Sequence, residues 1–264
     1  MPEFVEAEAY RRTIEPVLGR PMVSVDIRDD RLLRRDAADE SFVRGALEGS
    51  TIDATRRIGK AVLFDVSSGH TALLSFGLRG WLMLDGRTAR ATGHDWRART
   101  RRDAHVRLQI EFEGGQRLEL EDQLRLATLE LDPDESRFGI DVLDLDLDRL
   151  REILASSTTA VKTVLMDQRR IAGIGNLIAD EMLYQGKVDP RRSASELSDD
   201  EVADLWQGVR RTRERVLERN GSHQGVQIQS GARERGSCCP RCEVQVERIT
   251  VGGRTTYFCP SHQR

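Results

Sequence analysis

The sequence predicts an α+β protein with an N-terminal helix and antiparallel β-sandwich, a helical domain, and a small metal-binding β-hairpin. Three observations predict this class: strand patterns between residues 20 and 130, helical patterns between 147 and 219, and four cysteines confined to 238–259. Six strand runs without intervening helices are typical of antiparallel sandwiches or barrels. The expected divisions are residues 1–130, an acidic linker at 131–146, then 147–225 and 236–264.

The first element is a helix over residues 1 to about 18, in which Pro2 occupies the first turn. Its apolar positions recur every four residues and predict a buried stripe of Val5, Ala9, Thr13 and Val17. Short alternating runs separated by glycine-containing turns then predict strands. These strands are expected at 22–27, 61–66, 71–76, 81–84, 105–112 and 116–120.

Helical patterns follow the acidic stretch. Helices are expected at 147–154, 160–167, 177–185 and, as the longest, 201–219. Ser198 and Glu201 form a capping box before the longest helix, and Asn220-Gly221 supplies its end. No run of about 18 apolar residues and no secretory pattern occur, so we expect a soluble, cytoplasmic protein without a membrane partner.

The last segment has the spacing of a zinc site. Cys239 and Cys242 form one C-x2-C pair, and Cys259 and His262 form a second pair with the same spacing. Two such pairs joined by a β-hairpin complete a tetrahedral shell with no open position, which indicates a structural zinc ion. Cys238 could replace a ligand, but its spacing fits less well and a free thiol is the preferred interpretation.

The charge distribution is uneven. The chain carries −3 overall, but the segment from residue 210 to 264 holds eleven Arg, five Glu and neither Asp nor Lys, a net charge of +6. A basic terminal segment on an acidic body fits phosphate binding, although a solvated charge run explains it equally well. Arg254 is expected on the hairpin, with Arg241 and Arg248 nearby. In this basic segment, a contact with DNA is the preferred interpretation of Arg254, and a role in solubility alone is the alternative.

A glycine-rich turn separates two of the predicted helices. Gly173 and Gly175 allow successive backbone N–H groups to form an anion-binding nest, and Asn176 would cap the next helix. Such a motif alone is usually only a turn. Three cations strengthen the prediction of phosphate binding here: Lys162, Arg169 and Arg170.

The body of the chain offers no convincing nucleophilic triad, which directs attention to the N-terminus. Removal of Met1 leaves Pro2 with a free secondary amine, whose protonation is disfavoured by the helix dipole. Such an amine can form a Schiff base with a sugar aldehyde, with Glu3 and Glu6 as acid–base candidates. On chemistry alone, Pro2 as a simple helix start is the commoner case.

Four motifs in order resemble the formamidopyrimidine-DNA glycosylase / endonuclease VIII family across essentially the whole chain. The N-terminus matches M-P-E-x-x-E, and Lys60 follows Arg56-Arg57 as the family lysine does. Residues 162–176, followed by 179–181, are similar to its helix-two-turn-helix, and residues 239–262 to its zinc hairpin. The family cofactor is one structural zinc ion per chain, with Cys239, Cys242, Cys259 and His262 as the matching ligands.

The resemblance implies roles for individual residues. Pro2 would attack the deoxyribose of a flipped nucleotide, and Glu3 would transfer protons. Lys60, Asn176 and Arg254 would clamp the phosphates around the lesion. Further expected DNA contacts are Glu6, Leu78, Arg125 and Lys162. The implied partner is damaged double-stranded DNA, bound by a monomer.

The chain also departs from the family pattern. Leucines stand at 78, 124 and 126, where eight-oxoguanine enzymes have Met, Arg and Phe that fill the void left by the flipped base. Arg125 lies one residue out of register, so a weak preference for the opposite base is expected. The segment at 222–236 is short, and His262 replaces the usual fourth cysteine, an exchange zinc tolerates.

The leading hypothesis is a bifunctional DNA glycosylase and abasic-site lyase of base excision repair. The alternative is a damaged-DNA or abasic-site binding protein of the same fold with little excision activity, as suggested by the changed void-filling residues. A third, weaker hypothesis is a zinc interaction module fused to an unrelated sandwich.

Overall fold

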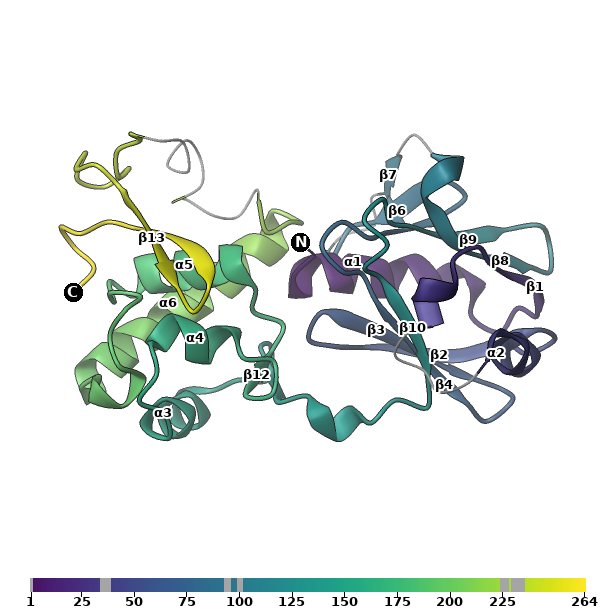
Figure 1. Ribbon diagram of the computed structural model, residues 1–264, viewed down its shortest axis with the longest axis horizontal. Helices are drawn as coiled ribbons and strands as arrows, with labels where there is room; N and C mark the ends of the chain where they lie inside the picture. The colour runs from purple at the N-terminus through teal and green to yellow at the C-terminus, as the bar shows by residue number, and fades with distance from the viewer. Residues whose placement is uncertain (1, 34–38, 93–95, 99–101, 224–227, 229–235) are drawn as a thin grey trace. The chain divides into compact units, whose positions relative to one another are not determined.

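The computed structural model describes residues 2–33, 39–92, 96–98, 102–223, 228 and 236–264 (Figure 1). The chain divides into two compact units, residues 1–136 and residues 137–264. No helix in the described part of the chain is long and apolar enough to cross a membrane.

The first unit contains two antiparallel sheets, with strand orders β1-β8-β9-β5-β6-β7 and β10-β4-β3-β2. The six strands of the larger sheet are β1 (Met22–Ile27), β5 (Trp81–Leu84), β6 (Arg87–Ala89), β7 (Trp96–Ala98), β8 (Val106–Phe112) and β9 (Arg117–Glu121). The four of the smaller sheet are β2 (Ile52–Ile58), β3 (Ala61–Val66), β4 (Thr71–Ser75) and β10 (Thr128–Leu131). Helices of this unit are α1 (Phe4–Ile14) and α2 (Glu40–Leu47), with short 3-10 turns at Glu15–Val17, Asp30–Leu33, Asp103–His105 and Glu135–Arg137.

One apolar core joins both sheets and α1. Strand β8 buries every second side chain, as its alternating sequence dictates, and Ile110 from this sheet shares a core cluster with Phe64 and Leu74 from the other. Helix α1 packs on β3, β5 and β6. Its Tyr10 is buried against Phe76, with ring centroids 4.4 Å apart, and donates a hydrogen bond to the Gly80 carbonyl. Helix α1 is therefore anchored to the sandwich.

The second unit is mainly helical. Its helices are α3 (Leu147–Ala155), α4 (Val161–Met166), α5 (Asn176–Gln185) and α6 (Asp199–Glu218), with a 3-10 turn at Ala194–Glu196. Its strands are β11 (Ile140–Asp141), β12 (Ile171–Ala172), β13 (Glu247–Val251) and β14 (Arg254–Phe258). Helices α5 and α6 pack closely because Gly208 has no Cβ, which would lie 2.4 Å from the Met182 carbonyl oxygen. The β13–β14 hairpin packs through β14 on α5 (Figure 1).

The expected fold class is confirmed, with corrections of detail. The N-terminal α-helix ends at Ile14, and Tyr10 is buried where the four-residue stripe had named Ala9, because a helix face repeats at both three and four residues. The capping box of Ser198 and Glu201 is present. Sequence patterns missed α2, β2, β6, β7 and β10, which are short or carry polar residues on both faces. The expected linker contributes β11, which pairs with β12 in the second unit.

Candidate functional site

The N-terminus of α1 is held by a reciprocal capping box. Glu3 is the N-cap residue, and its side chain accepts a hydrogen bond from the backbone nitrogen of Glu6. In return, the Glu6 carboxylate accepts a hydrogen bond of 2.9 Å from the backbone nitrogen of Glu3. Glu3 is 1% exposed. Two carboxylates thus lie at the positive end of the helix dipole, directly after Pro2, which is itself buried. Glu6 has a defined capping role, and its expected contact with DNA stays a prediction.

Lys60 lies in the tight turn between β2 and β3. Gly59 precedes it with a φ of +59°, a left-handed conformation that glycine adopts without strain. Lys60 is half-buried, and α1 packs against both strands that the turn joins. The turn, rather than a strand, therefore positions the expected phosphate contact.

The three leucines at the expected void-filling positions lie on two loops that touch. Leu78, Leu124 and Leu126 remain 43%, 43% and 38% exposed, and we call them the leucine tip. Gly77 permits the contact between the loops, because a Cβ there would lie 2.6 Å from the Leu126 Cβ. A set of exposed apolar side chains on adjacent loops favours contact with another apolar surface.

The loop that carries two of these leucines is held from beneath by Asp122. This fully buried carboxylate accepts hydrogen bonds from the backbone nitrogens of Leu124, Leu126 and Ala127, at 3.0, 2.6 and 2.8 Å. Three such bonds fix the loop conformation locally. The leucine tip is thus presented on a preorganised backbone.

Arg125 is directed to the protein instead. Its guanidinium binds both oxygens of Asp29, at 2.5 and 2.6 Å, and its backbone has a φ of +56°. The hydrogen bond from Arg125 holds the pKa of Asp29 down, from 3.8 to about 2. This pairing opposes the expected role of Arg125 in DNA contact, because releasing the guanidinium would leave a carboxylate that is 2% exposed without its principal partner.

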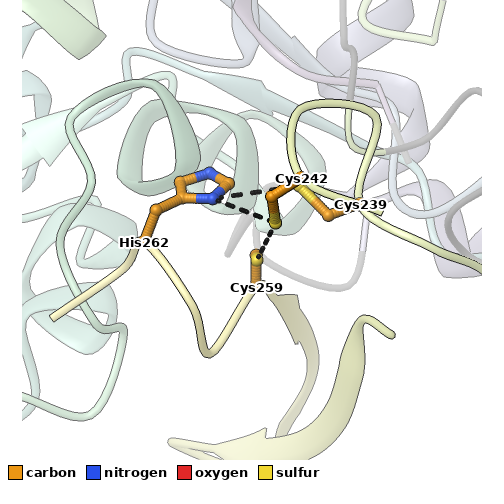
Figure 2. Close-up of side chains that lie close together, drawn as sticks. All are labelled: Cys239, Cys242, Cys259 and His262. Carbon is orange, nitrogen blue, oxygen red and sulfur yellow. Dashed lines mark hydrogen bonds between the residues drawn. The ribbon is translucent and has the colours of Figure 1, made fainter. Parts of the chain in front are cut away.

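Three sulfurs and one imidazole converge in the second unit (Figure 2). The ligand atoms of Cys239, Cys242, Cys259 and His262 all lie within 4.8 Å of one another. Cys242 Sγ lies 3.4 Å from Cys259 Sγ and 3.7 Å from His262 Nδ1, close to the separation of about 3.8 Å that tetrahedral zinc ligands have. The donor set therefore fits a zinc ion. Cys238 is exposed and lies outside this cluster.

A shell of contacts supports these ligands. The Tyr184 hydroxyl lies 3.5 Å from Cys239 Sγ, and its ring packs 5.1 Å from the imidazole of His262. Arg241 stacks 4.2 Å from the Tyr184 ring centroid. Burial and the positive charge of Arg241 lower the pKa of His262, which favours the neutral imidazole that a metal ligand needs. Helix α5 is thereby joined to the ligand cluster.

Polar contacts also fix the hairpin to the helices. The Lys162 ammonium is fully buried, 2.6 Å from Asp180 and 2.7 Å from the Thr256 hydroxyl. Asn176 donates from its side-chain amide to the Thr255 carbonyl at 3.0 Å. This burial argues against the expected phosphate contact of Lys162, because its ammonium has no exposed surface in this conformation. Its observed role is to hold β14.

The glycine turn is already hydrogen-bonded within the protein. Gly173 has a φ of +113°, as a left-handed turn residue, but its backbone nitrogen donates to the side chain of Gln168 at 3.0 Å. The N-cap of α5 is Gly175, and Asn176 is the first helical residue rather than a cap. The expected anion nest is therefore partly occupied. Arg254 is the first residue of β14, directly before Thr255, and its side chain is exposed.

Two family models match the chain within residues 1–228. The formamidopyrimidine-DNA glycosylase N-terminal domain matches residues 1–129, and the formamidopyrimidine-DNA glycosylase H2TH domain matches residues 132–228. The chain belongs to the formamidopyrimidine-DNA glycosylase family. The resemblance inferred from the sequence is thereby confirmed.

Relatives in this family match from end to end. The formamidopyrimidine-DNA glycosylase of Lactobacillus delbrueckii subsp. bulgaricus is 30% identical over 282 residues, with 98% of each chain covered. The Bacillus subtilis protein of the same name is 29% identical, with 100% of this chain and 99% of the relative covered. A Lactococcus lactis formamidopyrimidine-DNA glycosylase bound to DNA containing an abasic site has a TM-score of 0.84, covers 99% of both chains and is 24% identical, a likeness that shows the fold.

Within the H2TH domain of this family member, one buried carboxylate escaped the sequence-based assignment. Glu181 is 0% exposed; its Oε1 accepts from Gln185 at 2.6 Å and its Oε2 from the backbone nitrogen of Ile228 at 3.0 Å. Glu181 thus fastens the segment after α6 to α5. The only sequence signal was its place at the end of the motif 179–181, because its partner lies 47 residues away.

Proposed function

We propose that this chain is a bifunctional DNA glycosylase and abasic-site lyase that acts through the N-terminal amine of Pro2. The observation that supports this most is the terminus itself: Pro2 directly precedes a helix whose N-cap is the buried Glu3. The dipole of α1 disfavours protonation of an amine at this end, the neighbouring carboxylates of Glu3 and Glu6 favour it, and an α-amino group titrates close enough to neutrality to leave a fraction unprotonated. Damaged double-stranded DNA is the proposed substrate, bound by a monomer.

The proposed reaction begins when the Pro2 nitrogen attacks C1′ of the lesion sugar. The bond from C1′ to the base breaks, and the base leaves with the proton that the attacking Pro2 nitrogen loses. Opening of the C1′–O4′ bond, with a proton delivered to O4′ by Glu3, gives an iminium ion. Transfer of a C2′ proton to the Glu3 carboxylate gives an enamine, whose electron pair expels the 3′ phosphate and leaves a conjugated iminium ion. Water then hydrolyses the iminium ion, which releases an unsaturated aldehyde and restores the Pro2 amine.

The proposed DNA contacts come from both units. Lys60, Asn176 and Arg254 bind backbone phosphates, and the leucine tip occupies the space that the flipped nucleotide leaves. One zinc ion, held by the three cysteines and His262, stabilises the hairpin that carries Arg254. With four protein ligands, the metal would have a structural role and leave no position for a reacting water.

Trapping with borohydride tests the chemistry. Wild-type protein incubated with abasic-site duplex and borohydride should give a covalent complex, and mass spectrometry should place the adduct on Pro2. Pro2→Leu retains Met1 and should abolish the Pro2 adduct. Glu3→Gln should slow release of a damaged base by about a hundredfold or more while still allowing a complex with a preformed abasic site. An adduct on a lysine instead of Pro2 would refute the proposal.

A second candidate is a damage-binding protein with little excision activity. The leucine tip and the inward-facing Arg125 favour it, because both depart from the residues that serve the eight-oxoguanine enzymes. A panel of duplexes with oxidised purines, oxidised pyrimidines and abasic sites decides between the two. Tight binding to abasic DNA without turnover on any lesion would support the binding protein, whereas turnover on a single lesion would exclude it.

A further inference from the structure

Two consecutive arginines on β2 have opposite surroundings. Successive residues of a strand project to opposite faces of the sheet. Arg56 binds Glu135 through two hydrogen bonds, at 2.5 and 2.6 Å, and its side chain is 38% exposed. The Arg57 side chain is only 6% exposed. The neighbouring positions therefore form a natural pair for comparison, with Arg57 directed inward.

Arg57 contacts both elements that carry the proposed chemistry. Its Nη1 donates to the Gly59 carbonyl at 2.7 Å, inside the turn whose next residue is Lys60. Its Nε lies 3.5 Å from the Glu8 carboxylate, and its guanidinium lies 6.0 Å from the ring centroid of Phe4. Phe4 is the first residue of α1 and directly follows Glu3. A single side chain thus spans from the start of α1 to the Lys60 turn.

We propose that Arg57 is a positioning residue that sets the Lys60 ammonium relative to the N-terminal amine. This inference rests on the proposed function, in which Lys60 holds a phosphate of the nucleotide that Pro2 attacks. A guanidinium suits the task because its rigid, planar fork makes a hydrogen bond in one direction, an ion pair in another, and a face contact with an aromatic ring. A flexible ammonium cannot make all three contacts.

Arg57 can be replaced without leaving the Glu8 carboxylate unpaired. Glu8 also binds Arg11, with Nη2 to Oε1 at 2.7 Å, so the carboxylate keeps a counter-ion when Arg57 is removed. Methionine retains an unbranched apolar side chain in place of the arginine stem. Arg57→Met should therefore fold, while the turn loses the hydrogen bond from Arg57 to the Gly59 carbonyl.

The test is a double-mutant cycle in single-turnover cleavage of abasic-site duplex, with the full-length protein. Arg57→Met and Lys60→Met should each slow cleavage by about tenfold to a hundredfold, as displacement of a reacting or clamping group by about 1 Å does. The double variant should be no slower than Lys60→Met, because Arg57 acts through Lys60. Arg57→Lys should be intermediate. The matched control, Arg56→Met, should change the rate by less than about twofold.

Additive losses in the double variant, or a normal rate for Arg57→Met, would overturn the positioning role. If Arg57→Met does not fold, Glu8→Gln removes the ion pair from the other side. Glu8→Gln should slow cleavage by a smaller factor than Arg57→Met, and should not slow it further when Lys60→Met is already present. A further slowing in that double variant would overturn the inference. Failure of the wild-type protein to form a trapped complex would instead overturn the proposed function. The two failures are thereby distinguished.

Discussion

The start of α1 and the β13–β14 hairpin carry the proposed chemistry and the proposed grip, and they are stabilised by different forces. Helix α1 packs on a core shared by two sheets. The hairpin module has a small core of Tyr184, Ile228, Cys239, Val246 and Cys259, two of which are ligand cysteines. Polar contacts supply the rest, through Lys162 and Asn176. We therefore expect the stability of the hairpin, but not that of the N-terminal unit, to depend on a bound metal ion and on a buried ion pair.

Removal of a metal ligand should show the largest difference between the two regions. Zinc contributes about 10 kcal/mol or more to the folding of small zinc modules, so Cys242→Ser should unfold the hairpin. Hydrogen exchange should then accelerate in β13 and β14 while β3 and β8 stay protected. Affinity for abasic-site DNA should fall about a hundredfold, as contacts worth about 1.5–3 kcal/mol each are lost. Cys238→Ser, which lies outside the cluster, is the control; unchanged exchange in Cys242→Ser would contradict the comparison.

Breaking the buried ion pair should have the next largest effect. Lys162→Met leaves the Asp180 carboxylate, 0% exposed as a side chain, without its cation, which typically costs about 3–5 kcal/mol. Native-state hydrogen exchange at β14 should report this loss. Adding Asp180→Asn removes the stranded charge but keeps an acceptor for the Tyr257 backbone, so the double variant should recover most of the stability. Equal instability of the single and double variants would exclude a charge effect.

The leucine tip sharpens the comparison at the level of specificity. Wild-type cleavage rates for one lesion opposite cytosine and opposite adenine should differ by less than about threefold, because leucines offer no hydrogen bond. Leu124→Arg should create a preference for one opposite base of about tenfold, the lower end of what a well-placed arginine provides. Leu143→Arg, an exposed leucine in the other unit, controls for added charge. A strong wild-type preference would show that another residue recognises the opposite base.

The smallest expected effect concerns the pH dependence of the loop that carries the tip. The pKa of Asp29 is lowered from 3.8 to about 2, so its pairing with Arg125 stabilises the fold fully above about pH 4. This contribution decreases as the pH falls and is lost through pH 2. The urea midpoints of wild type and Asp29→Asn should therefore differ at pH 5 and converge towards pH 2. A difference independent of pH would show that the ion pair is not its source.

Local spacing accounts for what the sequence predicted well. The four residues that could hold a metal ion lie in two short C-x2-C and C-x2-H pairs, and the capping box of α6 spans four residues. Alternation within β8 and the periodicity of α6 are likewise properties of a single segment. In each case the interacting residues are close in the chain, so the residue types at those positions are enough to specify the contact.

By itself, the sequence determined the fold class, the family, the metal-ligand set and the helix that follows Pro2. Only the tertiary structure showed which of these cations are paired within the protein: Lys162 with Asp180 and Thr256, and Arg125 with Asp29, 96 residues away. It likewise decided that Gln168 closes the glycine turn and that Arg57 bridges to α1. The reason is physical: a charged side chain has the same composition signal whether solvated or paired, and only folding brings its distant partner within hydrogen-bond range.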